Sequence, residues 1–485
     1  MARPINFAAL DLNALPRPGR RAIEAAVALM VCSLVGAVWL MAPHVPLPAL
    51  ALLIAALPVA VWLLFQAPLV LVVGFICFSL FRVHEVILPL KPLRIPQLLA
   101  LGALAALALM FFTRRLRAYL TIELGLLLSF FILVTLQIPF AANSSLASKY
   151  WSDTYSKIMI MAFAVAWLVE KPSQISQILR VMTIIGAGIA GVAVYNSLNG
   201  IGLVEGSRVT INRAQGSALG DPNDLAMVLL FPIGFAASLA IARSSGVFDR
   251  FVGIASMPVL VWGLLATQSR GGLLGLVAVM GVFAWNRVRN KLLLIAVGVL
   301  ALIGLFAAAG IGERSVVAAG GGVGAIDESA EGRLLAWGAA TSMALANPLT
   351  GVGIDNFVPN FYYYVSEWHG MAKAVHSTWF QALGETGFTG FFLFIALIAV
   401  TAMRGVATWR HLGGLRDNRA AERLRDQTEA LLAALAGFCV AGTFLTQAFT
   451  WPVYILIALL VSAKRIEQDL LATPSAVLSA PVSKS

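Results

Sequence analysis

The stretch Val375-His376-Ser377-Thr378-Trp379-Phe380-Gln381-Ala382-Leu383-Gly384-Glu385-Thr386-Gly387 closes the longest polar gap in a chain that otherwise consists of apolar runs. Apolar runs long enough to cross a bilayer precede this gap, and three more follow it before the C-terminus. Polytopic membrane proteins that keep one large hydrophilic segment normally use it for chemistry or binding at the membrane surface. The stretch therefore ends one candidate functional loop and precedes the last membrane helices.

The composition of the whole chain identifies a membrane protein. Of its 485 residues, 60% are hydrophobic and only 12% are charged, and the mean hydropathy is +0.87. A water-soluble domain of this length and composition would expose large apolar patches. We therefore predict an all-α polytopic integral membrane protein with about 12–14 transmembrane helices.

The apolar runs give the predicted order of the helices. The helices are expected over residues 22–42, 47–66, 68–81, 96–112, 118–137, 155–169, 178–196, 224–242, 251–267, 272–286, 291–311, 387–403, 428–447 and 449–463. They define an N-terminal segment, a first set of membrane helices, a large outer loop, a second set of membrane helices and a tail. These regions span residues 1–21, 22–311, 312–386, 387–463 and 464–485.

The orientation follows from Lys and Arg, which are retained on the cytoplasmic side of short loops. Basic clusters precede the first predicted helix, follow the fourth and the tenth, and occupy the last long loop and the tail. They are Arg17, Arg20, Arg21, Arg114, Arg115, Arg117, Arg287, Arg289, Lys291, Arg404, Arg410, Arg416, Arg419, Arg423, Arg425, Lys464 and Arg465. We expect both termini and residues 404–427 in the cytoplasm and the loop of residues 312–386 outside.

Several basic residues fall on the outer face against this rule. They are Arg82, Lys91, Arg94, Arg208, Arg213, Arg270, Arg314, Arg333 and Lys373. Each one alone is equally compatible with a solvated or snorkelling side chain. As a group, gathered around the loop that contains His376, they predict a site for an anion.

Two short stretches before the large loop contain the most informative of these cations. Asp221 is predicted to cap a helix, with Pro222 in its first turn and Asp224 at the position of a capping-box acid, so both acids are expected to be structural. Capping does not explain Arg213, which precedes them. Arg270 separates two apolar helices joined by almost no loop, and at that depth a partner for its charge is expected.

Within the large loop, residues 333–346 are predicted to form a helix at the membrane surface that ends at Asn347-Pro348. Gly351 and Gly353 favour a tight turn over a phosphate-binding loop. The aromatic residues that follow suit a membrane interface or a sugar-binding surface equally well. They are Phe357, Phe361, Tyr362, Tyr363, Tyr364 and Trp368.

No metal site is predicted from the sequence. The one close acidic cluster in the outer loops, Asp327, Glu328 and Glu331, has no His beside it and lies in a Gly- and Ala-rich segment that we expect to be flexible and solvated. The cysteines, Cys32, Cys77 and Cys439, lie in separate apolar runs without metal-ligand or disulfide spacing.

His376 is a candidate catalytic residue. Ser377 is a plausible cap for a helix that runs through Gln381 and Glu385 toward Gly387. A helix start and nearby arginines both disfavour an added positive charge, so the imidazole is expected to stay neutral and able to accept a proton. The alternative is an ordinary surface His or one satisfied by structural hydrogen bonds.

The order of these motifs resembles the O-antigen ligase superfamily. The motifs are an Arg-Ala-x-Gly turn ahead of Asp-Pro-Asn, a Ser-Arg-Gly at a helix start, an Arg-x-x-x-Trp helix, a Pro-Leu-x-Gly-x-Gly turn and a His with Glu-x-Gly downstream. They cover roughly residues 200–400. Many members have His-Asn where this chain has His376-Ser377. Any role of that Asn side-chain amide in the family therefore has no equivalent at Ser377.

The resemblance implies a C-type glycosyltransferase architecture and an undecaprenyl diphosphate-linked glycan donor, used at the periplasmic face of the bacterial inner membrane. It also implies that neither a nucleotide sugar nor any metal or other cofactor is required. The family's essential His corresponds to His376, and its essential arginines to Arg213 and Arg270, with Arg333 in support. Membrane lipids surround such a protein, and no nucleic acid is expected as a partner.

This reaction fits the chemistry of the residues. Arginines can stabilise a departing diphosphate bidentately without Mg²⁺, and His376 can take the proton of the acceptor hydroxyl as general base or position that acceptor. Displacement on an α-linked donor would invert the anomeric centre. We therefore assign His376, Arg270 and Arg213 to catalysis. The predicted substrate-binding residues are Arg333, Arg208, Arg82, Lys91, Arg94, Lys373 and, more weakly, Glu385, for which an ordinary helix acid is the simpler explanation.

Four functions remain open at this point. We favour an O-antigen ligase whose acceptor is a lipid A-core sugar. An O-antigen polymerase or a protein O-glycosylation ligase would share the donor chemistry. A transporter of lipid-linked glycans or anions would be expected to place charges inside its spans and to show paired repeats, whereas the polar residues here gather on one face.

Overall fold

The computed structural model describes residues 68–87, 90, 95–113, 116, 118–308, 324–368, 370, 372–415 and 418–472. Several predictions therefore lie outside the described residues. They are the helices over residues 22–42 and 47–66, the basic residues Lys91, Arg94 and Arg314, and the first two cytoplasmic Arg clusters.

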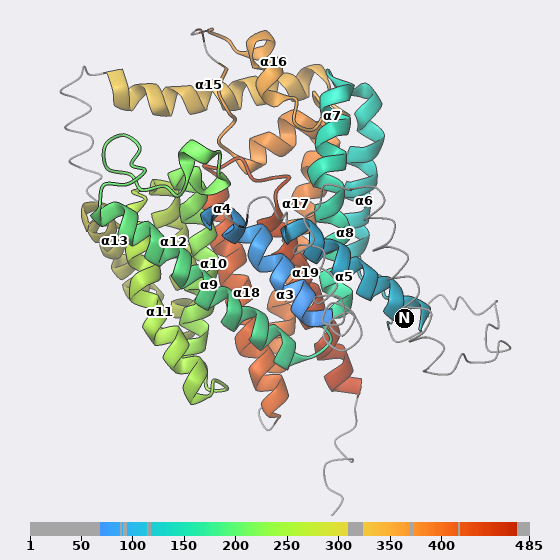
Figure 1. The fold of residues 1–485 in the computed structure, drawn as a ribbon, viewed down its shortest axis with the longest axis vertical. Coiled ribbons are helices and arrows are strands. Elements are labelled where there is room, and N and C mark those ends of the chain that lie inside the picture. The colour runs from blue at the N-terminus through green and yellow to red at the C-terminus, as the bar shows by residue number, and fades with distance from the viewer. Residues whose placement is uncertain are drawn as a thin grey trace, which may run out of the picture. The chain divides into compact units, whose positions relative to one another are not determined.

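The described part of the chain is helical, as predicted, and its only β contact is an isolated bridge between Val204 and Arg208. The helices are α3 (Pro68–Leu80), α4 (Val83–Val86), α5 (Ile95–Phe112), α6 (Ile122–Gln137), η3 (Ile138–Phe140), α7 (Ser144–Tyr150), η4 (Trp151–Tyr155), α8 (Ser156–Leu168), α9 (Pro172–Leu198), η5 (Arg213–Gln215), η6 (Ala218–Gly220), α10 (Pro222–Ile241), α11 (Val247–Ala266), α12 (Arg270–Arg287), α13 (Lys291–Ala308), α15 (Gly324–Ala346), α16 (Phe357–Tyr364), α17 (Thr378–Leu412), α18 (Arg419–Gly442) and α19 (Trp451–Ala472) (Figure 1). Each predicted apolar segment in this part overlaps one helix, although α17 begins before residue 387 and α18 ends before residue 447.

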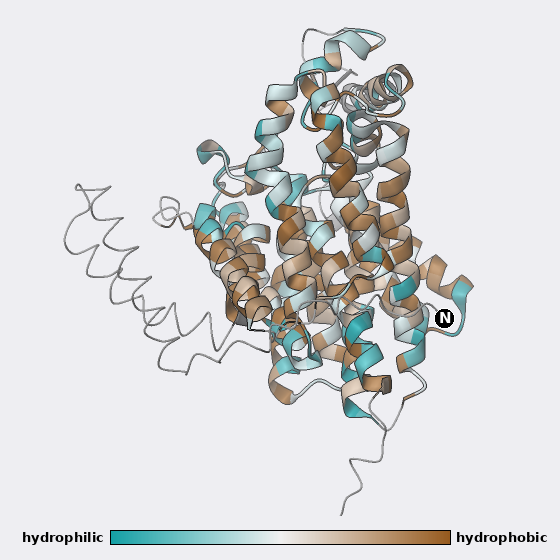
Figure 2. Ribbon diagram, turned by 90° about the vertical axis from the view of Figure 1, so that its right-hand side faces the viewer, coloured by the Kyte–Doolittle hydropathy of each residue, from teal (hydrophilic) through white to brown (hydrophobic). Residues whose placement is uncertain are grey.

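Six of the described helices are long and apolar enough to cross a membrane. They are the helices over Ile95–Phe112, Ile122–Phe140, Pro172–Leu198, Pro222–Ile241, Val247–Ala266 and Thr378–Leu412, and shorter apolar helices cover Leu69–Leu80 and Lys291–Ala307. Figure 2 shows hydrophobic helices through the middle of the described unit and hydrophilic segments toward its two ends. The chain is thus an all-α polytopic membrane protein.

The helices run back and forth between these two ends. At one end, α15 and α16 lie near the loops that join α9 to α10, α11 to α12 and α18 to α19 (Figure 1). At the other end, Arg287 pairs with Glu429 at 2.8 Å, and Arg404 pairs with Glu123 at 2.6 Å. Arg287 and Arg404 therefore lie at the end opposite to α15, which carries Arg333, whereas the side of the membrane that each end faces stays a prediction.

The helix α15 begins earlier than predicted. Residues 333–346 are helical as expected, but the helix starts at Gly324, so the acidic positions 327, 328 and 331 belong to it and not to a flexible loop. The glycines and alanines of this segment misled the sequence interpretation, because alanine is the strongest helix former and offsets the cost of the glycines.

A break divides α17 into two helices at Gly387, whose φ of 68° and ψ of −172° are not helical. The turn before α16 fills the break. Phe388 N–H donates to Pro348 O at 2.9 Å, and Gln137 Nε2 donates to Leu349 O at 2.8 Å and Thr386 O at 3.1 Å. The sequence had predicted one helix running toward Gly387 and another beginning there. The first of these two helices carries His376 at its start.

Candidate active site

Three elements fix the position of His376. Its backbone N–H donates to Thr446 Oγ1 at 3.0 Å, in the loop between α18 and α19. The carbonyl of Val375 accepts a hydrogen bond of 3.1 Å from Trp337 Nε1 on α15. Ser377 caps α17, as predicted, by accepting the N–H of Phe380 at 3.5 Å. The imidazole therefore lies where α15, α17 and the loop between α18 and α19 meet.

The backbone of His376 is strained. Its φ of 47° lies in the left-handed region, which non-glycine residues adopt at a cost of about 1–2 kcal/mol. The other described non-glycine residues with positive φ are Arg82, Glu205, Asn212, Gln268 and Asp355. All six lie in loops at the same end of the helices, and such strain concentrates at functional sites.

The surroundings of His376 keep its ring neutral. Burial lowers the pKa of the imidazole, and the positive charge of Arg333 lowers it further, while the negative charge of Asp221 acts in the opposite direction. The net effect is a pKa below the ordinary value of 6.5. At neutral pH the ring is therefore unprotonated and can accept a proton, as predicted from the sequence.

Two cations from the large loop lie together near this ring. The guanidinium of Arg333, on α15, lies 5.9 Å from the centroid of the Phe444 ring. Lys373 packs against the neighbouring residue of α15, because a Cβ atom at Gly332 would lie 2.6 Å from Lys373 Nζ. The side chain of Lys373 thus lies beside the residue that precedes Arg333 in α15.

Arg270 reaches this region from another helix. It is the first residue of α12, and Ser269 caps that helix by accepting the N–H of Gly272 at 3.2 Å. A Cβ atom at Gly271 would lie 3.4 Å from Phe444 Cβ, so Phe444 lies between the start of α12 and Arg333. Arg270 is exposed and has no hydrogen-bond or ion-pair partner within the described ranges. Among the described residues, no group supplies the partner that the sequence led us to expect for this charge.

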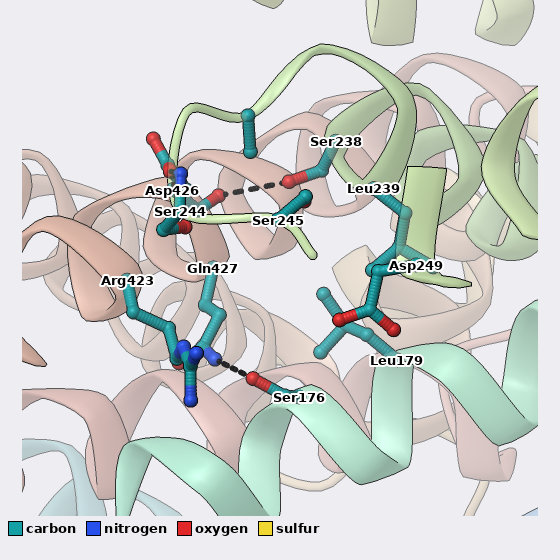
Figure 3. A pocket seen from close by; sticks show the side chains of 11 residues that line it. Ser176, Leu179, Ser238, Leu239, Ser244, Ser245, Asp249, Arg423, Asp426 and Gln427 are labelled. Carbon is teal, nitrogen blue, oxygen red and sulfur yellow. Dashed lines mark hydrogen bonds between the residues drawn. The ribbon is translucent and has the colours of Figure 1, made fainter. Parts of the chain in front are cut away.

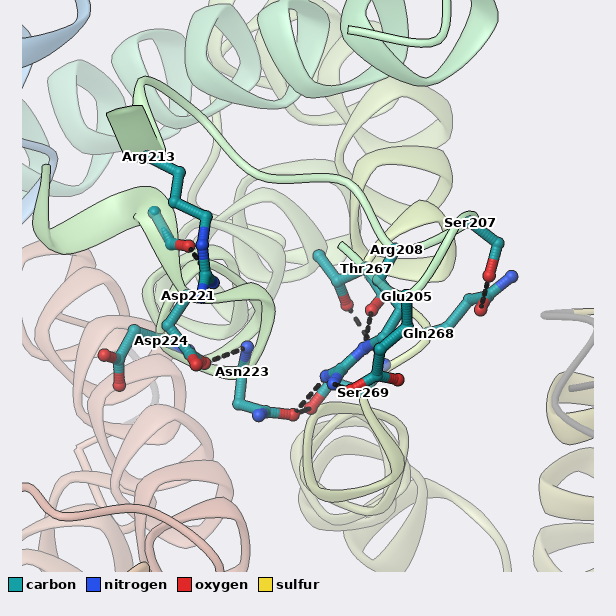
Figure 4. A network of polar contacts seen from close by, with 11 residues as sticks. Glu205, Ser207, Arg208, Arg213, Asp221, Asn223, Asp224, Thr267, Gln268 and Ser269 are labelled. Carbon is teal, nitrogen blue, oxygen red and sulfur yellow. Dashed lines mark hydrogen bonds and ion pairs between the residues drawn. The ribbon is translucent and has the colours of Figure 1, made fainter. Parts of the chain in front are cut away.

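A polar network joins the starts of α10 and α12 (Figure 4). Asn223 Oδ1 accepts hydrogen bonds from Arg208 Nη2 at 2.7 Å and from Ser269 Oγ at 2.8 Å. Arg208 also donates to Thr267 O at 3.2 Å and is only 8% exposed. Its guanidinium is thus occupied with structural contacts, although the sequence placed it among the substrate-binding residues.

Arg213 extends along the same network. Its Nη1 donates to Gly220 O at 3.1 Å, and Figure 4 shows the side chain directed toward the start of α10, close to Asp221. Asp221 caps α10, as predicted, by accepting the N–H groups of Asn223 at 2.7 Å and Asp224 at 3.3 Å. Arg213 is exposed, so most of its donors remain available to a ligand.

The described geometry can now be compared with known proteins. Residues 255–395 match the family model described as O-antigen ligase. This match confirms the resemblance to the O-antigen ligase superfamily. A search of curated proteins found no match.

The matched O-antigen ligase segment contains Arg270, Arg333, Lys373 and His376. It begins after Arg213, so the turn that holds Arg213 and the start of α10 lie outside it. The resemblance over residues 200–400 is therefore matched only in its later part. The network around Asn223 nevertheless ties the unmatched part to the start of α12 inside the matched segment.

Besides Arg208, two more of the predicted substrate-binding residues are engaged with protein groups. Arg82 lies before α4 and pairs with Glu85 at 3.2 Å. Glu385 is 3% exposed and accepts the backbone N–H groups of Asp355 at 3.1 Å and Phe357 at 3.3 Å. Glu385 thus anchors the turn before α16, and it is not the ordinary helix acid that the sequence offered as the simpler explanation.

The glycine turn before α16 is a packing device, as the sequence favoured. The N–H of Gly351 donates to Asn347 O at 2.8 Å, and that of Gly353 donates to Glu385 O at 3.0 Å. Both glycines have positive φ, and a Cβ atom at Gly351 would lie 2.5 Å from Gly384 O. These amides are occupied by protein carbonyls and do not form a cradle for phosphate.

The loop between α18 and α19 was missed as part of the site. Besides Thr446, it contributes Gln447, whose Nε2 donates to Asp224 Oδ1 at 2.8 Å. Asp224 therefore contacts this loop and does not complete a capping box. The signal in the sequence was the run of Thr and Gln residues at positions 443–450, which interrupts two apolar segments that we had separated by a single residue.

A separate polar pocket lies at the opposite end of the helices, between α9, α10 and α18 (Figure 3). Gln427 Nε2 donates to Ser176 Oγ there at 2.6 Å, and Ser238 Oγ donates to Asp426 O at 3.2 Å. The lining residues are Ser176, Leu179, Ser238, Leu239, Ala242, Ser244, Ser245, Asp249, Arg423, Asp426 and Gln427. None of them belongs to the predicted site.

Proposed function

We propose that this protein is an O-antigen ligase, an inverting glycosyltransferase of the bacterial inner membrane. It would transfer a glycan from undecaprenyl diphosphate to a lipid A-core sugar at the periplasmic face. The observation that supports the proposal most directly is the position of Arg333, which lies over the Phe444 ring and lowers the pKa of His376. Phe444 also packs beside Gly271, the residue after Arg270. The O-antigen ligase match over the same residues supports it.

In this reaction the acceptor hydroxyl attacks the anomeric carbon of the donor sugar. The bond between that carbon and the diphosphate oxygen breaks, and its electron pair leaves with the diphosphate. Arg270 and Arg213 bind the negative charge that develops there, and Arg333 and Lys373 add to the positive field. His376 takes the proton of the attacking hydroxyl as general base, which requires the neutral ring.

The runner-up functions share this donor chemistry. An O-antigen polymerase would use the growing glycan as acceptor, and a protein O-glycosylation ligase would use a protein side chain. A transporter is disfavoured because Arg270, Arg213 and His376 lie at or just before the starts of helices in the described part of the chain, and not along a path through the spanning helices. Offering the purified protein each class of acceptor separates these alternatives.

The decisive experiment separates charge from geometry at Arg270 and Arg213. Lysine keeps the charge but loses the bidentate fork, so Arg270→Lys and Arg213→Lys should both lower turnover. Alanine should lower it further, on the order of 10²-fold, as removal of one electrostatic donor does in other enzymes. His376→Ala should be nearly inactive while still binding lipid-linked donor. Donor binding and transfer are measured separately in purified protein.

Arg465→Lys is the matched control, because Arg465 lies near the end of α19, away from the site, where it pairs with Asp469 at 3.3 Å. It should transfer glycan at the wild-type rate. If both site lysine variants also matched the wild type, the arginines would be ordinary interfacial anchors and the mechanism would be wrong.

A further inference from the structure

We propose that Tyr362, Tyr363 and Trp368 form a binding surface for the acceptor glycan, a proposal that rests on the glycosyltransferase function above. These side chains are 57%, 75% and 43% exposed. Their rings form one group, with centroids 5.4 Å apart between Tyr362 and Tyr363 and 5.0 Å apart between Tyr362 and Trp368. The other predicted aromatic residues have different surroundings: Phe357 and Phe361 are buried. Tyr364 packs against the same hydrophobic cluster, and its hydroxyl accepts a hydrogen bond from Asn347 Nδ2 at 3.2 Å.

The chemistry of this surface fits a saccharide. Exposed rings offer flat apolar area to the C–H faces of sugar rings, while the Tyr hydroxyls and the Trp N–H can hydrogen-bond to sugar hydroxyls. A membrane-interface belt is the other reading of such residues. However, α16 lies at the extreme end of the described helices in both ribbon views, beyond α15 and away from the hydrophobic sides of the spanning helices (Figures 1 and 2). The segment that carries these rings therefore lies at the end of the helices where the proposed glycan transfer takes place.

The surface is also coupled to His376 through the core beneath it. The rings of Trp368 and the buried Phe361 have centroids 6.3 Å apart. Phe361 and Val375 belong to one hydrophobic cluster, and Val375 directly precedes His376. The eight residue steps from Trp368 to His376 span at most about 26–29 Å even when fully extended. A short oligosaccharide on the rings could therefore present its terminal hydroxyl to the imidazole.

The acceptor is a better occupant than the donor. The donor is held by its diphosphate at Arg270, on another helix, whereas the rings and His376 belong to the same loop. Since the proposed role of His376 is to take a proton from the acceptor, the segment that leads into it is suited to hold that acceptor.

The test measures the affinity of purified protein for lipid-free core oligosaccharide by calorimetry, and KM and kcat for the acceptor in the transfer reaction. Tyr362→Ala combined with Tyr363→Ala should raise Kd and acceptor KM by about tenfold, the scale expected for loss of two ring contacts. The value of kcat and the affinity for lipid-linked donor should not change. Trp368→Ala should act in the same direction, and Trp368→Phe should restore most of the affinity because it keeps a ring.

Tyr195→Ala is the control, because Tyr195 is 61% exposed in the last turns of α9, outside the aromatic surface. It should bind oligosaccharide like the wild type. Wild-type Kd and KM in the double Tyr variant, or weakened binding of donor in place of acceptor, would overturn the proposal. His376→Ala distinguishes the two proposals, since it should bind oligosaccharide normally without transferring glycan. Unimpaired transfer by His376→Ala would refute the catalytic mechanism. The aromatic surface would then be tested by the oligosaccharide affinities alone.

Discussion

At the scale of single residues, the neutral state of His376 depends on its neighbours. Arg333 lowers the pKa of the imidazole by its charge, in addition to the larger effect of burial. A general base is active only when unprotonated, so a lowered pKa extends activity to more acidic pH. The acid limb of the pH–rate profile should therefore lie below the ordinary His pKa of 6.5.

Arg333→Gln tests this electrostatic coupling. Removal of the positive charge should raise the pKa of His376, so the acid limb of kcat should move to higher pH, whatever happens to the maximal rate. Transfer rates measured from about pH 5 to 8 show the shift. Arg465→Gln, which removes a positive charge far from the site, should leave the limb in place. An unmoved limb in Arg333→Gln would mean that another group, and not His376, titrates in catalysis.

The hydrogen-bond partners of individual arginines could not be predicted from the sequence. Charge counting predicted which cations share one face, but it treated Arg208 and Arg270 alike. Arg208 is occupied because it contacts Thr267 and Asn223, whereas Arg270 is exposed at a helix start. Such contacts join residues that are distant in sequence, and hydropathy and charge patterns contain no information about these pairings.

At the scale of elements, the break in α17 sets the position of the site. Gly387 adopts a backbone conformation that is essentially restricted to glycine, and a Cβ atom there would lie 2.6 Å from Pro348 O. We expect Gly387→Ala to destabilise the protein by roughly 1–3 kcal/mol or more and to lower transfer, because the turn beside α17 would be displaced. Thermal unfolding in detergent and transfer rate are the measurements.

Gly338→Ala provides the comparison for that variant. Gly338 lies within α15, and a Cβ atom there would meet nothing within 4 Å. Alanine should therefore leave stability unchanged or raise it by roughly 0.5–1 kcal/mol. Equal Tm values for the two variants would show that the break at Gly387 does not require glycine.

The elements themselves were largely predictable. Membrane helices bury their backbone polar groups internally, so long apolar runs have few alternatives to a helix. The caps at Asp221 and Ser377 were also visible as local signals. The loop between α18 and α19 was missed despite its Thr and Gln residues, because its role comes from contacts with α10 and α17, which are distant in the sequence.

At the scale of the whole molecule, the two ends of the helices should face opposite sides of the membrane. In a background without Cys32, Cys77 and Cys439, a single cysteine near Ser329 should react with an impermeant thiol reagent in intact spheroplasts. A single cysteine near Asn418 should react only after the membrane is permeabilised. The reverse pattern would place the arginines in the cytoplasm and remove the basis for a periplasmic reaction.

Because the backbone of His376 is left-handed, the residue that would be most stable at this position differs from the residue that the proposed reaction needs. A glycine there would relieve the strain at little steric cost, so a collection of variants selected only for survival on heating should become enriched in His376→Gly. Those survivors would have lost the imidazole and with it the proposed proton acceptor. Programmes that engineer a more robust form of this protein should therefore hold position 376 constant.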